Sequence, residues 1–138
     1  MYSDEILNHF KNPQHVGELT AADGVGIAHG GEQCPHDIAH FWIRVRAGRV
    51  VAVSHKTKGC PVAIASSSMT AVLAQGQTLE DAEALTTELV AQKLGGMPER
   101  KLDSIVGPAA LRNAIADYHK RGCSSESRAE DGDGGAHP

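Results

Sequence analysis

The chain has 138 residues, of which 41% are hydrophobic and 22% charged, and its formal net charge is −4. This length fits one globular domain, and the mild negative charge argues against a nucleic-acid partner. No stretch approaches the roughly 20 apolar residues that a membrane span needs. Three cysteines cannot build a disulfide framework, and the start of the chain, with Asp4 and Glu5, is unlike a signal peptide. We therefore expect a cytoplasmic protein with reduced thiols.

The first half of the chain predicts one helix followed by two strands. Ser3 can cap a helix that ends before Pro13. Apolar and polar side chains then alternate over residues 41–46, as in a strand that is buried on one face. Ala47-Gly48 suggests a hairpin that leads to a valine-rich strand over residues 49–55.

A glycine-rich stretch, residues 24–31, lies between that helix and the strands. It is not a phosphate-binding loop, because a cysteine and a strand follow it rather than the start of a helix. The sequence pattern assigns it no helix or strand.

The second half of the chain predicts helices. Pro61 suits a first helical turn, and Thr78 with Asp81 resembles a capping box. The helices are expected over 61–75 and 79–85, from Thr86 or Thr87 to Gly95, and from Gly107 through Lys120 with Gly122 as the stop. A helix, then strands, then helices make an α+β fold, in which a small antiparallel sheet of about three strands packs on helices.

Residues 123–138 contain almost no apolar side chains, so we expect a disordered tail after a domain over residues 1–122. Cys123 is then an exposed tail thiol. It follows the whole last helix, about 15 residues or roughly 20 Å from that helix's start. This distance argues against Cys123 as a ligand.

The most informative position is Cys60, in the run Lys56-Thr57-Lys58-Gly59-Cys60-Pro61-Val62-Ala63-Ile64-Ala65-Ser66-Ser67-Ser68. A lone thiol here opens an apolar helix of small residues. The unpaired amides and the positive dipole end at a helix start favour a thiolate, which is the form that binds metals and accepts sulfur. A small buried core thiol is the structural alternative.

This run resembles the segment that holds the second of three cluster-binding cysteines in the NifU/IscU-type iron-sulfur cluster assembly scaffolds. The resemblance covers about residues 1–121. It includes Asn8-His9-Phe10-Lys11-Asn12-Pro13-Gln14-His15-Val16-Gly17, Gly76-Gln77-Thr78-Leu79-Glu80-Asp81-Ala82 and Ala114-Ile115-Ala116-Asp117-Tyr118.

The resemblance implies a metal site made by Cys34, Asp37, Cys60 and Asp103, in which Cys34, Cys60 and Asp103 bind the cluster. Cys34 and Asp37 match a Cys-Gly-Asp loop of the family, but Pro35-His36 separates them here instead of one glycine. Thiolates and carboxylates suit iron or zinc, and thiolates also suit iron-sulfur clusters.

The third family cysteine is missing. It belongs to a Lys-x-His-Cys-Ser segment before the last helix, where this chain has Lys101-Leu102-Asp103-Ser104. We place Asp103 where the thiolate would be, because the helix pattern beyond it is intact. Asp103 is either a ligand or an ordinary capping residue near a helix start, and both roles stay open.

Among the histidines, His36 is the candidate for contact with a metal, since it lies between Cys34 and Asp37. His40 and His55 fall on the predicted strands, where a solvated face is expected.

The resemblance implies a carrier, not an enzyme. Such a scaffold takes sulfur from a cysteine desulfurase, adds iron, builds a transient cluster, expected to be [2Fe-2S], and passes it to apo proteins. It would be a monomer or a weak dimer. One alternative is a divergent paralogue that holds Zn(II) or Fe(II) in the same site and acts in sulfur relay or regulation. Another is a thiol enzyme with Cys60 or Cys34 as nucleophile and His36 as its base.

The family also carries a Leu-Pro-Pro-Val-Lys segment that a dedicated chaperone pair reads. The corresponding residues here are Met97-Pro98-Glu99-Arg100-Lys101. The first proline and the lysine are kept, but an arginine replaces an apolar residue, which argues against that recognition.

Overall fold

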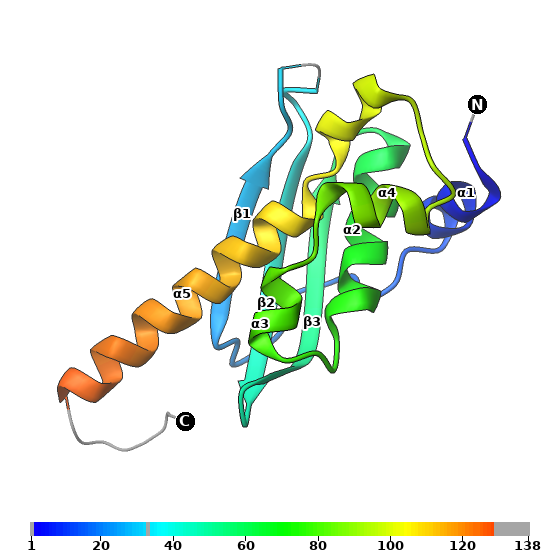
Figure 1. Cartoon of the computed structure of the whole chain (residues 1–138). Coiled ribbons are helices and arrows are strands. Elements are labelled where there is room, and N and C mark those ends of the chain that lie inside the picture. Colours follow the sequence, from blue (N-terminus) through cyan, green and yellow to red (C-terminus); the bar gives the residue numbers. More distant parts are fainter. Residues whose placement is uncertain (1, 33, 129–138) are drawn as a thin grey trace.

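The computed structural model describes residues 2–32 and 34–128 (Figure 1). A three-stranded antiparallel sheet has the order β1 (Gly24–His29), β2 (Ile38–Arg46), β3 (Arg49–Lys58). The helices are α1 (Asp4–Lys11), α2 (Pro61–Ala74), α3 (Leu79–Glu83), α4 (Thr87–Lys93) and α5 (Gly107–Arg128), with a 3-10 helix, η1, over Glu99–Ser104. This arrangement confirms the predicted α+β class.

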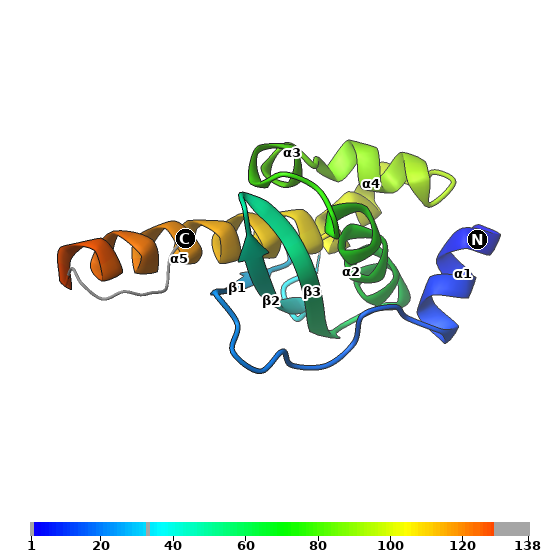
Figure 2. The same ribbon diagram turned by 90° about the horizontal axis from the view of Figure 1, so that it is seen from below.

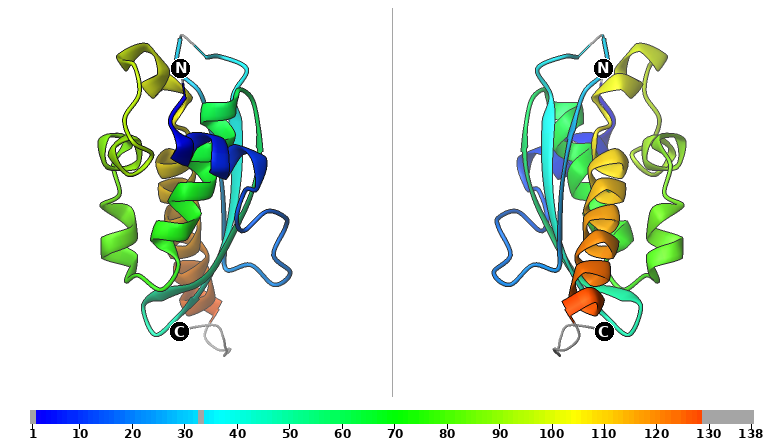
Figure 3. Two further views of the ribbon diagram at one scale, coloured as in Figure 1. Left: turned by 90° about the vertical axis from the view of Figure 1, so that its right-hand side faces the viewer. Right: turned by 90° about the vertical axis from the view of Figure 1, so that its left-hand side faces the viewer.

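The elements form layers. α2 and α5 cover one face of the sheet, and α3 and α4 lie outside these two helices (Figures 2 and 3). The main core fills the space between sheet and helices. Phe41, Ile43 and Val45 contribute to it from β2, as predicted, but the alternation is incomplete because Trp42 between them is also buried. Leu111 and Ile115 enter the same core from α5.

The glycine-rich stretch forms β1, an element that the sequence pattern did not assign. A Cβ atom on Gly24 would lie 2.2 Å from the carbonyl oxygen of Ala114, and one on Gly26 would lie 2.2 Å from the amide nitrogen of Ala114. α5 therefore lies directly on the backbone of β1. The glycines remove the side-chain alternation by which a strand is recognised, and the same glycines make this close contact possible.

Side chains of α5 also hydrogen-bond the backbone of β1, which is an edge strand. The Val25 amide donates to Asp117 Oδ2 at 2.9 Å, and the side-chain amide of Asn113 donates to the Ile27 carbonyl oxygen at 2.8 Å. Both contacts add to the backbone packing and fix α5 along the strand.

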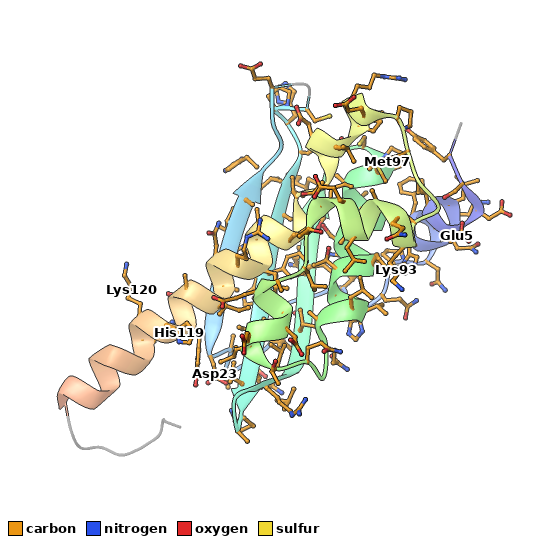
Figure 4. The ribbon with its side chains drawn as sticks, viewed as in Figure 1. Glu5, Asp23, Lys93, Met97, His119 and Lys120 are labelled. Atoms are coloured by element: carbon orange, nitrogen blue, oxygen red, sulfur yellow. The ribbon has the colours of Figure 1, made fainter. Side chains whose placement is uncertain are left out.

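A second core cluster joins α1 to α2 and α4. The Ser3 hydroxyl caps α1 by accepting from the Ile6 amide at 3.1 Å, as predicted, and it donates to the Leu94 carbonyl oxygen. Ile6 packs with Val90 and Leu94 in this cluster. Figure 4 shows Glu5 of α1 on the side of the molecule where α4 ends, near Lys93 and Met97.

The outer edge of β3 is covered by residues 15–17. The His55 amide donates to the His15 carbonyl oxygen, and the Gly17 amide donates to the His55 carbonyl oxygen, both at 2.9 Å. The expected solvated face is wrong for His55, which is 1% exposed. Its register places it opposite Phe41, on the core face, where the two rings stack.

α5 continues past Gly122, the predicted stop, to Arg128. An isolated glycine inside a helix costs about 1 kcal/mol relative to alanine, which a long helix tolerates. The backbone of Cys123 thus lies within α5. Residues 129–138 lie outside the described residues, so the disordered tail stays a prediction. Within the described ranges, no helix has the length and apolar character that crossing a membrane requires.

Gly26→Ala should lower the free energy of unfolding by about 1–3 kcal/mol, because the new methyl group meets backbone atoms of α5 that cannot rotate away. Gly48→Asn is the control. A Cβ there meets nothing within 4 Å, and its φ of 74° is one that Asn tolerates, so a change of about 0.5 kcal/mol or less is expected. Urea unfolding of both variants tests this, and equal costs would contradict the close contact.

His55 should make the fold acid-sensitive. Burial lowers its pKa from 6.5 to about 4, against an opposing effect of the Gln14 carbonyl oxygen, which lies 2.9 Å from Nε2. The unfolded chain therefore binds a proton between pH 6.5 and 4 that the folded chain does not bind. The stability that His55 contributes is complete above about pH 6.5, falls as the pH drops towards 4 and then levels off, a loss of about 3 kcal/mol.

Unfolding free energies measured from pH 7 to pH 4 test this prediction. His55→Gln keeps a donor for the Gln14 carbonyl oxygen but does not titrate in this range, so its pH dependence should be much flatter. An equally steep decline in the variant would assign the acid sensitivity to other groups.

Candidate functional site

Three segments meet at one end of the molecule, at the top of Figure 1: the loop between β1 and β2, the start of α2, and the end of η1. They carry the two thiols Cys34 and Cys60, together with Asp37 and Ser104. The β2–β3 hairpin and Asp23 lie at the opposite end of the sheet (Figure 4).

The loop that carries Cys34 is closed by its own backbone. The Cys34 amide donates to the Gly31 carbonyl oxygen at 2.9 Å, and the Asp37 amide donates to the Cys34 carbonyl oxygen at 3.2 Å. The Gly30 amide donates to the Asp37 carbonyl oxygen at 2.8 Å. A Cβ atom on Gly30 would lie 2.1 Å from the Cys34 carbonyl oxygen, so only glycine permits this tight closure.

Asp37 connects the loop to the start of α2. Cys60 is the N-cap residue of α2, but its side chain makes no capping hydrogen bond. Asp37 Oδ1 instead accepts from the Cys60 amide at 3.1 Å, and Asp37 Oδ2 lies 3.7 Å from Cys60 Sγ. Gly59 makes room, since its φ is +146° and a Cβ there would lie 2.1 Å from Asp37 Oδ1. The buried Asp37 thus caps α2 from a different segment.

Ser104 lies between the two thiols. Its hydroxyl donates to Cys34 Sγ at 2.8 Å and accepts from Cys60 Sγ at 3.2 Å. Ser104 is fully buried, whereas both cysteines are free and partly exposed. One hydroxyl therefore bridges two sulfur atoms that approach the surface. The sequence prediction missed Ser104, although it directly follows Asp103 in the segment aligned with the third family cysteine.

Small residues of α2 hold Ser104 in place. Ser66 Oγ lies 3.5 Å from the Ser104 carbonyl oxygen, and the Thr70 hydroxyl donates to the Ser66 carbonyl oxygen at 2.7 Å. A Cβ atom on Gly107 would lie 2.4 Å from Thr70 Oγ1, so the chain after Ser104 passes directly against α2. The serine-rich run after Cys60 and the glycine at the start of α5 both serve this contact.

The other predicted residues lie at the margin of this cluster. Asp103 is within η1, and a Cβ on Gly31 would come within 2.6 Å of its carboxylate. His36 is exposed, and no hydrogen bond among the described residues joins it to either thiol. Among the side chains of residues 2–32 and 34–121, no three of His, Cys, Asp or Glu form a group that could hold a metal ion.

The structure thus brings together three predicted residues, Cys34, Asp37 and Cys60, with Ser104 as the link between the thiols. Asp103 is a sequence neighbour of that link. The four-residue ligand set stays a prediction.

The sequence model of the NifU-like N terminal domain matches residues 1–125. The chain belongs to this family. An iron-sulfur cluster assembly scaffold protein IscU 1 of Archaeoglobus fulgidus is 42% identical over 122 residues, which are 88% of this chain and 78% of that protein. The corresponding IscU of Azotobacter vinelandii is 36% identical over 124 residues, covering 88% and 97%.

Two solved structures share the fold. The N-terminal part of a NifU-like protein from Brucella abortus superposes with a TM-score of 0.67 at 20% identity, over 86% of this chain and 94% of that one. A putative scaffold protein for the SUF system of Fervidobacterium islandicum gives 0.66 at 17% identity, over 83% and 96%. At these identities the likeness supports the fold alone.

Asp37→Ala should lower the free energy of unfolding by about 1–2 kcal/mol, because the amide of Cys60 loses its acceptor at the start of α2. Asp37→Asn should lose less, since the amide oxygen can still accept. The exposed neighbour His36→Ala is the control, with an expected change of about 0.5 kcal/mol or less. Chemical unfolding measures all three, and an Asp37→Ala variant as stable as the parent would remove the capping role.

Proposed function

We propose that this chain is an iron-sulfur cluster assembly scaffold. The observation that carries the proposal is the pair of partly exposed thiols, Cys34 and Cys60, held on either side of one hydroxyl at the end of a NifU-like domain. Relatives that are 42% and 36% identical to it over the aligned residues are named as scaffold proteins of this kind.

The chemistry of the site fits this cargo. Thiolates are the usual protein ligands of iron-sulfur clusters, and two of them come here from separate segments that converge on one point. The thiols are partly open to water, so a cluster can leave as well as form. Asp37 adds a carboxylate beside Cys60, which suits iron. We propose [2Fe-2S] as the cluster, with Zn(II) or Fe(II) able to occupy the same groups.

The proposal extends to the partners. A cysteine desulfurase supplies the sulfur, and apo iron-sulfur proteins receive the cluster in the cytoplasm. The chain acts as a carrier without turnover of its own, as a monomer or a weak dimer. The alternative of a thiol enzyme has no support from His36, which is exposed and does not hydrogen-bond either thiol among the described residues.

Cys34→Ser and Cys60→Ser should each abolish cluster formation, because removal of either sulfur leaves one thiolate at the site. The assay is anaerobic reconstitution of the full chain with ferrous iron, cysteine and a cysteine desulfurase, read by visible absorption and by iron and sulfide content. Cys123→Ser is the control and should load like the parent.

Labelled cysteine in the same assay shows which thiol accepts sulfur, and we expect Cys60 to be indispensable. A parent chain that binds one tight zinc ion and forms no cluster would contradict the proposed function. A Cys60→Ser variant that still takes up label and metal like the parent would contradict the assignment of Cys60.

A further inference from the structure

We propose that Ser104, rather than Asp103, is the third donor of the site, so that its hydroxyl oxygen completes a set with Cys34 and Cys60. This inference rests on the proposed function and adds to it a residue of this chain. When the Oγ–iron bond forms, the hydroxyl proton passes to water, and the iron keeps its oxidation state.

The position of the hydroxyl carries the proposal. Ser104 Oγ is within hydrogen-bonding distance of both sulfur atoms, 2.8 Å from Cys34 Sγ and 3.2 Å from Cys60 Sγ. An iron or zinc ion that binds both sulfur atoms from the space between them is therefore also within reach of Ser104 Oγ. The Asp103 carboxylate lies beside Gly31, at the other end of the turn that the Cys34 amide closes.

The partners of the hydroxyl are unusual for a buried serine. Buried Ser and Thr side chains in helices commonly donate to a backbone carbonyl a turn earlier. The Thr70 hydroxyl donates to the Ser66 carbonyl oxygen, and the Ser66 hydroxyl donates to the Ala63 carbonyl oxygen. The Ser104 hydroxyl instead bonds two thiols, which are weak hydrogen-bonding groups.

The backbone at Ser104 is well fixed. Its carbonyl oxygen lies 3.5 Å from Ser66 Oγ, and Gly107 brings the following residues against Thr70. Because the backbone is held from both sides, a side chain at position 104 points between the thiols whatever its chemistry. A thiol placed there would therefore join the two that are present.

An oxygen donor in place of a third sulfur affects the lifetime of the bound cluster. Thiolates hold iron-sulfur clusters better than oxygen donors do, so a site with two sulfurs and one hydroxyl holds its cluster loosely. Ser104 therefore helps to set how quickly this chain releases its cluster.

The test compares Ser104→Cys with Asp103→Cys, two variants that add the same thiol one residue apart. Each full chain is loaded anaerobically as above, and the decay of cluster absorbance is followed after a chelator is added. We expect Ser104→Cys to lengthen the half-life of the cluster about tenfold or more, and Asp103→Cys to leave it within about twofold of the parent. Lengthening by Asp103→Cys alone would overturn the proposal in favour of Asp103.

Zinc binding gives a second measurement that does not depend on cluster assembly. The affinity of the purified chain for Zn(II), determined by competition with a chromophoric chelator, should fall about tenfold in Ser104→Ala. Ser67→Ala is the matched control: Ser67 is a buried serine of α2 whose hydroxyl has no hydrogen-bond partner among the described residues, so zinc affinity should be unchanged.

The outcomes separate the two proposals. A parent chain that forms no cluster contradicts the scaffold function, and the zinc measurement still decides the role of Ser104. A parent chain that loads a cluster, with neither cluster lifetime nor zinc affinity altered by the Ser104 substitutions, overturns the third donor and leaves the scaffold function intact. A Ser104→Cys chain that fails to fold, judged by circular dichroism, leaves the decision to Ser104→Ala.

Discussion

The hydrogen bond from the Cys60 amide to the Asp37 carboxylate is the contact on which the site depends. It joins the loop before β2 to the first turn of α2, and it replaces the cap that Cys60 itself does not provide. Without it, the buried Asp37 carboxylate would lose an amide donor and the first turn of α2 would lose its acceptor, which is costly for both groups. One bond thus holds the helix start beside the loop that bears Cys34, and it requires the glycine at position 59.

The small residues of α2 are the second constraint. Ser66 and Thr70 satisfy their own hydroxyls within the helix and leave a surface that the chain around Ser104 can approach closely. A helix with larger side chains here would push η1 and the start of α5 away from the thiols. The packing of α2 therefore sets the distance between the third segment of the site and the first two.

Much of the fold could be predicted from local chemistry. The Ser3 and Thr78 caps could be predicted, and Thr86 was one of two candidates for α4, because each of these hydroxyls bonds an amide only three residues away. The strand at 41–46 could be predicted because the residues of one of its faces are apolar. β1 could not be predicted, because its glycines are required by a close contact with the backbone of α5, which is far away in the sequence. The burial of His55 likewise depends on a pairing with Phe41 that local sequence does not reveal.

The residues of the site likewise divide into those that local sequence predicts and one that only the tertiary structure reveals. Cys60 and its helix start followed from a contiguous run of residues, and Cys34 and Asp37 followed from the resemblance of their loop. Ser104 depends on how η1 meets α2, which is a tertiary contact. A serine that follows an aspartate carries no sign of metal chemistry in its own sequence neighbourhood, so only its position beside two sulfurs distinguishes it.

The bonding of the two edge strands also has a consequence for how this chain behaves in solution. Open edges of a small sheet invite strand addition from a second molecule, which leads to aggregation. Here residues 15–17 occupy the edge of β3, and Asn113 and Asp117 occupy backbone groups of β1. Each edge of the sheet is therefore occupied in part by its own chain. The backbone groups that are bonded in this way cannot also pair with a strand of a second copy, which lowers the tendency of a chain with two exposed thiols to associate through its sheet.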